Sequence, residues 1–107
     1  MKKNSKQLSV EHEDFLASAL GGRRTKASGA SYHDPGDVIC PHEIIEAKVT
    51  RKNSITIRKS YWEKIRNEAH TGRKPLMALR FVDENDNPIY DLVVQELDDY
   101  IIDTRKV

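Results

Sequence analysis

A chain of 107 residues, 37% hydrophobic and 33% charged, is long enough for one small domain with a lean core. None of its apolar runs approaches the roughly 20 residues that a membrane-spanning helix needs. The single cysteine, Cys40, excludes an internal disulfide framework and favours a reducing compartment, so a cytoplasmic protein outside the membrane is expected.

The formal net charge is only +1, but the charges are distributed unevenly. Residues 1–80 carry 16 Lys and Arg against 9 Asp and Glu, whereas residues 81–107 carry 2 against 8. A basic main part with an acidic tail is consistent with nucleic acid contacting one face. A solvated surface with a solubilising acidic tail would give the same pattern.

Residues 1–8 are polar and basic, and they are predicted to form a flexible arm ahead of a folded domain that spans residues 9–107. Ser9, followed by three acids, is typical of a helix start, because a hydroxyl caps free N–H groups and acids favour the positive end of a helix. The Gly-Gly pair that begins at Gly21 predicts that this helix ends at Leu20.

Glu13 falls on the inward stripe of this helix at the i, i+3, i+4, i+7 spacing. The apolar members of the stripe are Leu16, Ala17 and Leu20. A carboxylate on an inward face needs a partner, such as a metal ion. Glu11 lies on a different face of the helix and is the alternative acid.

Residues 23–33 are cationic, rich in small residues and weakly hydrophobic, which predicts a strand start that leads into a loop. Three cations in this segment are well placed to hold phosphates: Arg23, Arg24 and Lys26. An ordinary basic loop is the simpler interpretation.

Two short apolar runs, Val38-Ile39 and Ile44-Ile45, flank a Cys-Pro-His-Glu turn and predict a β-hairpin. Asp37 stands at the start of the first strand. Because strand side chains alternate between faces, Glu46 and Lys48 point the same way from the second strand. A carboxylate from one strand is therefore expected to meet a carboxylate and a lysine from its neighbour.

Two carboxylates beside an ammonium group are what metal-assisted phosphodiester cleavage requires. Carboxylates hold Mg²⁺, which activates water and stabilises the developing charge. The lysine positions the nucleophile or helps to deprotonate it. Mg²⁺ is thus the expected cofactor, with Mn²⁺ able to substitute.

Residues 51–54 predict a polar turn, residues 55–57 a short strand by alternation, and residues 58–70 a helix. Residues 51–80 carry nine cations and two acids, which favours a surface that tracks phosphates. The candidates for these contacts are Arg51, Lys52 and Lys59. A solvated helix face is the competing interpretation.

The rest of the chain predicts two further strands. Residues 76–82 read as a buried strand, residues 83–88 as a turn, and residues 89–97 as a closing strand. Within the acidic end, residues 100–102 are apolar enough to pack on the domain or on a second subunit. The expected fold is α/β, with a central mixed β-sheet flanked by helices in a single domain.

An ordered set of features along residues 11–82 resembles the PD-(D/E)XK nuclease superfamily. The set is an acidic helix, Gly21-Gly22-Arg23-Arg24, Ser28-Gly29, Gly36-Asp37 and the triplet Glu46-Ala47-Lys48. It is most similar to archaeal-type Holliday junction resolvases and related small phage-encoded enzymes. The resemblance implies a nuclease domain over residues 9–107 that cleaves branched DNA, in the host cytoplasm if a phage encodes it. Paired incisions on opposed strands imply a two-fold homodimer.

The resemblance also implies roles for single residues. Glu13, Asp37 and Glu46 would be metal ligands, Lys48 would orient or activate the attacking water, and the hydroxyl of Ser28 would contact the metal's water shell or a phosphate. Asp34 is a rival to Asp37, because a glycine interrupts the literal Pro-Asp pair.

Two other functions fit the same sequence. A nuclease of this superfamily could act on flaps, ends or ordinary duplex instead of junctions. A small DNA-binding module without catalysis would carry the Glu-X-Lys triplet as an accident of strand composition.

Overall fold

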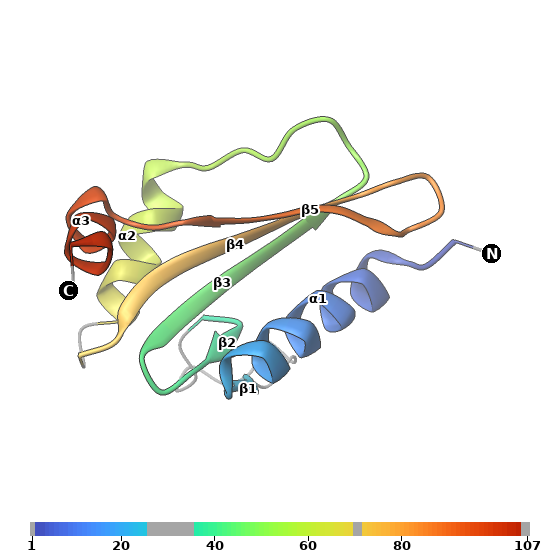
Figure 1. Ribbon diagram of the computed structural model, residues 1–107. Coiled ribbons are helices and arrows are strands. Elements are labelled where there is room, and N and C mark those ends of the chain that lie inside the picture. Colours follow the sequence, from blue (N-terminus) through green and yellow to red (C-terminus); the bar gives the residue numbers. More distant parts are fainter. Residues whose placement is uncertain (1, 26–35, 70–71, 106–107) are drawn as a thin grey trace.

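The computed structural model describes residues 2–25, 36–69 and 72–105. Within these residues the chain forms a single α/β domain of three helices and one five-stranded mixed sheet (Figure 1). The elements in chain order are α1 (Ser5–Leu20), β1 (Arg23–Arg24), β2 (Val38–Ile39), β3 (Glu43–Thr50), α2 (Lys59–Glu68), β4 (Lys74–Val82), β5 (Pro88–Val94) and α3 (Leu97–Thr104). The expected α/β class with a central mixed sheet and flanking helices is confirmed.

The strands lie in the sheet in the order of the sequence, from β1 to β5. The β1–β2, β2–β3 and β4–β5 pairs are antiparallel, whereas β3 and β4 are parallel and are connected through α2. The predicted hairpin is confirmed, since Val38 pairs with Ile45 and Ile39 with Ile44.

Alternation along β3 gives the sheet two apolar faces, each covered by a helix (Figure 1). On the face that α1 covers, the core contains Leu16, Val38, Cys40, Ile45 and Ala78. On the opposite face Ile44 packs against Ile65 and Ala69 of the α2 region.

The first helix begins earlier than predicted. Asn4 caps α1 through a reciprocal pair of hydrogen bonds with Gln7, and Leu8 in the second turn is 6% exposed. Residues 5–8 are therefore helix, and the prediction of a flexible arm over residues 1–8 is wrong for them. The predicted end is correct, because Gly21 takes a left-handed φ of 68° immediately after Leu20.

Residues 55–57 are not a strand in this structure. They belong to the connection that returns from the end of β3 to the start of α2, and they pair with none of the described strands. The predicted strand over residues 89–97 ends at Val94, and the acidic end forms α3. Of the helices in the described part of the chain, none is long and apolar enough to cross a membrane.

Candidate functional site

Asp37 enters the sheet from a turn that requires glycine. Gly36 has a φ of +65°, and a Cβ there would lie 2.8 Å from Ile44 Cγ2 and 2.9 Å from the Ile45 carbonyl oxygen. The amide of Asp37 donates to that same carbonyl at 2.8 Å. Its carboxylate Oδ2 accepts a hydrogen bond from the Ala47 amide at 2.9 Å. These contacts hold the Asp37 carboxylate against the backbone of β3, next to Glu46.

Glu46 occupies a strongly perturbed environment. Burial, followed by the charge of Asp37 and a side-chain hydrogen bond with Asp37, raises the pKa of its carboxyl to about 7. Its Oε2 is buried and has no hydrogen-bond partner among the described residues. Within the described residues, this buried carboxyl beside a second carboxyl is therefore not fully hydrogen-bonded.

Two lysines oppose this negative pair. Lys64 of α2 and Lys48 of β3 both lower the pKa of Glu46. The Lys48 ammonium lies 5.1 Å from the centre of the Tyr61 ring, within the range of a cation–π contact. The Lys64 ammonium donates to Glu68 Oε1 at 3.1 Å. The predicted grouping of Asp37, Glu46 and Lys48 is therefore present, together with an additional lysine.

Glu13 lies near this group but is already paired. Arg24 Nε donates to Glu13 Oε1 at 3.1 Å, and Arg24 also lies 3.7 Å from Asp14 Oδ1. Burial raises the pKa of Glu13, the Arg24 hydrogen bond lowers it, and the charge of Asp37 raises it. Glu11 instead pairs with Lys3 at 2.7 Å. Of the two alternative acids, Glu13 is the one beside Asp37.

The three predicted metal ligands do not form one cluster in this structure. Across residues 2–25, 36–69 and 72–105, no three His, Cys, Asp or Glu side chains gather as a metal-binding group. Asp37 and Glu46 form a pair, whereas the carboxylate of Glu13 is bound to the Arg24 guanidinium. Ser28 and Lys26, as well as the rival acid Asp34, lie outside the described residues.

The cations predicted to contact phosphates differ in their exposure and in the bonds they make within the fold. Arg51 is bound to the side chain of Asp86 and to the Lys3 carbonyl oxygen, so it fastens the start of the chain to the β4–β5 turn. Lys52 and Lys59 are exposed, and so is Arg23 on β1. Arg51 therefore has a structural role that the sequence pattern did not indicate.

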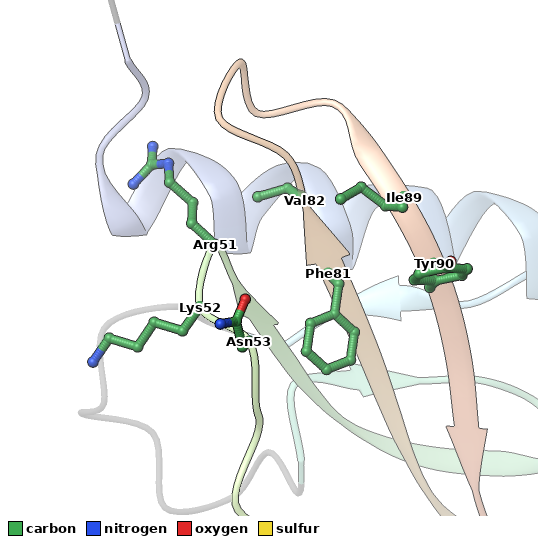
Figure 2. Close-up of a pocket in the computed structure, with 7 residues that line it drawn as sticks. All are labelled: Arg51, Lys52, Asn53, Phe81, Val82, Ile89 and Tyr90. Atoms are coloured by element: carbon green, nitrogen blue, oxygen red, sulfur yellow. The ribbon is translucent and has the colours of Figure 1, made fainter.

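Beyond Arg51, the end of β3 borders a shallow hollow of about 320 Å³ (Figure 2). The rings of Phe81 and Tyr90, which pair across β4 and β5, form one wall of it. Asn53 lines the same hollow. This hollow lies past the C-terminal end of β3, whereas Asp37 contacts β3 at Ala47. None of the residues that line it belongs to the carboxyl pair.

Three residues near the site were missed in the sequence: His12, Lys64 and Glu68. His12 is 1% exposed, next to Glu13, and its Nε2 lies 3.9 Å from Asp91 Oδ1. The cationic character of residues 51–80 includes Lys64 but does not distinguish it from the other cations, and it assigns no role to Glu68. Lys64 and Glu68 are four residues apart in the sequence, which predicts that they share one side of a helix. That spacing does not predict which strand this side of the helix faces.

No family model matches this sequence, and no curated protein matches it either.

Proposed function

We propose that this chain is a divalent-metal-dependent DNA endonuclease with a PD-(D/E)XK-type site, and that its substrate is the four-way Holliday junction. The observation that carries the proposal is the pairing of Asp37 with Glu46 beside two lysines. Unpaired buried carboxyls are costly unless a cation compensates them, and they recur at functional sites.

The residues fit a divalent cation. Mg²⁺ is usually bound through one or two carboxylates and completes its octahedral shell with waters and phosphate oxygens. The Ala47 amide donates a hydrogen bond to Asp37 Oδ2, and Glu46 Oε2 is buried with no hydrogen-bond partner in the described part of the chain. The proposed cofactor is therefore Mg²⁺, with Mn²⁺ as a substitute, and Asp37 and Glu46 as its protein ligands.

A bound Mg²⁺ would supply an activated water and stabilise charge on the attacked phosphate. Lys48 orients that water and favours its deprotonated form through its positive charge. Arg23, Lys52 and Lys59 hold phosphates of the substrate strands. Ser28 adds a hydroxyl contact. Glu13 would be the third acid at the metal, and Arg24, which is bound to Glu13, would hold a phosphate of the substrate.

The choice of a junction follows from what the surface offers. The proposed DNA contacts are cations that bind phosphates and carry no base-edge code, so selectivity would rest on the shape of the DNA. Two symmetric incisions would require a homodimer. Exposed apolar side chains on β5 and α3 support such an association.

The test compares cleavage of a synthetic four-way junction with cleavage of linear duplex of the same sequence, in Mg²⁺, in Mn²⁺ and in EDTA. We expect Asp37→Asn and Glu46→Gln to lower the cleavage rate by at least about 100-fold while DNA binding stays within about 3-fold, because a lost ligand charge disables the metal and leaves the basic surface intact. Glu84→Gln, in the β4–β5 turn, is the control for loss of one acid.

Equal cutting of junction and duplex would remove the junction assignment and leave a general nuclease. Metal-independent binding without cleavage, unchanged by Asp37→Asn, would favour a non-catalytic DNA-binding module.

A further inference from the structure

One face of α2 is directed at the proposed site. Tyr61, Lys64 and Glu68 are spaced i, i+3, i+7 and therefore share a side of the helix. Each contacts its surroundings: Tyr61 contacts Lys48 of β3, Lys64 contacts Glu68, and Glu68 contacts the turn before β2. The helix thus forms a wall of the site.

Glu68 connects this wall to the carboxyl pair. Its Oε1 accepts hydrogen bonds from the Gly36 amide at 3.3 Å and from the Lys64 ammonium at 3.1 Å. Ile65, one residue after Lys64, is 1% exposed and fixes the helix at the same turn. The ammonium of Lys64 is therefore held over the turn from which Asp37 enters the sheet.

The charges agree with this placement. Lys64 lowers the pKa of Glu46 more than Lys48 does, although Lys48 is the lysine of the Glu-X-Lys triplet. Burial acts to lower the pKa of Lys64, but the Glu68 hydrogen bond and the charges of Glu46 and Asp37 raise it overall. The side chain of Lys64 is 60% exposed, so its ammonium also faces the solvent that a DNA strand would occupy.

We propose that Lys64 is a second lysine of the active site, that its ammonium contacts a phosphate oxygen of the cleaved strand, and that Glu68 is its positioning residue. The proposal rests on the function proposed above. It assigns different tasks to the two lysines, since the Lys48 ammonium lies over the Tyr61 ring, whereas the Lys64 ammonium is bound to Glu68 on a largely exposed side chain. A simple surface ion pair of Lys64 with Glu68 is the alternative, and it predicts no effect on DNA.

The experiment compares Lys64→Met with Lys74→Met in the full chain. Lys74 also forms an exposed ion pair with an acid, Asp103, but at the start of β4, so the control removes an equal charge and an equal contact. Two readouts are taken on junction DNA. One is single-turnover cleavage with Mg²⁺, and the other is binding in EDTA over a series of salt concentrations.

We expect Lys64→Met to lower the cleavage rate by about 10- to 100-fold and to reduce the slope of log Kd against log salt concentration by about 1, as expected for one lost phosphate contact. Lys64→Arg should restore the slope, because it restores the charge. Glu68→Gln keeps an acceptor for the Gly36 amide and loses the charge that holds Lys64, so it should lower the cleavage rate by a smaller factor. Thermal unfolding of each variant checks that the fold is intact.

This inference is overturned if Lys64→Met and Lys74→Met have equal cleavage rates and equal slopes of log Kd against log salt concentration. The proposed nuclease function would be unaffected by that result. A wild-type chain that leaves every DNA intact in Mg²⁺ would overturn both proposals together.

Discussion

The imidazole of His12 lies one residue before Glu13 and is almost completely buried between α1 and the sheet. Arg80 forms a double hydrogen bond with Asp91 beside it, and the Arg80 guanidinium also stacks over the Phe15 ring. Burial, and then the charge of Arg80, lower the pKa of His12 to about 4, against smaller opposing effects of Asp91 and Asp37. The folded protein therefore keeps this histidine neutral.

This burial predicts a pH-dependent stability. An unfolded histidine takes up a proton near pH 6.5, whereas the folded one does so only near pH 4, so the unfolded state binds more protons in between and His12 makes stability fall as the pH drops through that window. Urea unfolding of wild type and His12→Gln at pH 7.5 and 5.5 measures it. The advantage of wild type over the variant should shrink by about 1 kcal/mol at the lower pH.

Glu46 acts in the opposite sense, because its raised pKa makes the folded state the better proton binder between its ordinary pKa of 4.5 and about 7. That effect is common to wild type and His12→Gln and cancels in the difference between them. If the difference in unfolding free energy between wild type and His12→Gln stays constant with pH, His12 is not held neutral by burial.

At the scale of elements, the turn into β2 determines where Asp37 lies relative to β3. The positive φ of Gly36, the hydrogen bond from its amide to Glu68 and the pairing of Val38 with Ile45 together fix one register. A shift of one residue would send the Asp37 side chain to the other face of the sheet. The position of the proposed metal ligand thus depends on a glycine that carries no chemistry itself.

Two glycines with nearly equal backbone angles test this point. Gly36→Ala should destabilise the fold by about 3 kcal/mol or more, because it adds steric overlap with Ile44 and the Ile45 carbonyl to the strain of a positive φ. Gly21 has a φ of +68°, and a Cβ added there would meet nothing within 4 Å. Gly21→Ala should therefore lower the free energy of unfolding by only about 1 kcal/mol. Denaturant unfolding of both variants gives the comparison, and equal losses would contradict the steric argument.

At the scale of the whole molecule, the C-terminal part of the sheet leaves an apolar surface exposed. Leu97, Tyr100 and Ile102 of α3 are each more than half exposed, and so are Tyr90 and Val93, which lie on opposite faces of β5. β5 is the outermost strand of the sheet, so its free edge adds unpaired backbone groups to that surface. A homodimer formed through this surface would cover it and would bring two proposed sites into one particle.

The association is testable by sedimentation. Wild type should sediment as a dimer of the 12.3 kDa chain, and Ile102→Glu should shift it to monomer because it buries a charge in the apolar contact. In a junction assay the monomer should make single nicks in place of paired incisions. Ile57→Glu adds the same charge at an exposed apolar residue before α2 and should remain dimeric. Monomeric wild type at assay concentration would contradict the proposed assembly.

The sequence by itself determined the features that depend on near neighbours along the chain. The Val38-Ile39 and Ile44-Ile45 runs predicted the hairpin, and Gly21 the end of the first helix, because alternation and left-handed glycine conformations are local properties. Since Asp37 and Glu46 belong to one hairpin, their meeting could be predicted as well.

Only the tertiary structure decided the contacts that join distant segments. It bound Arg51 to Asp86, bound Glu13 to Arg24, left residues 55–57 outside the described strands, and bound Lys64 to Glu68, where its charge lowers the pKa of Glu46. Periodicity states which side of its own element a side chain occupies. Which other element faces that side depends on how α1 and α2 pack against the sheet, and the burial of the whole core determines that packing.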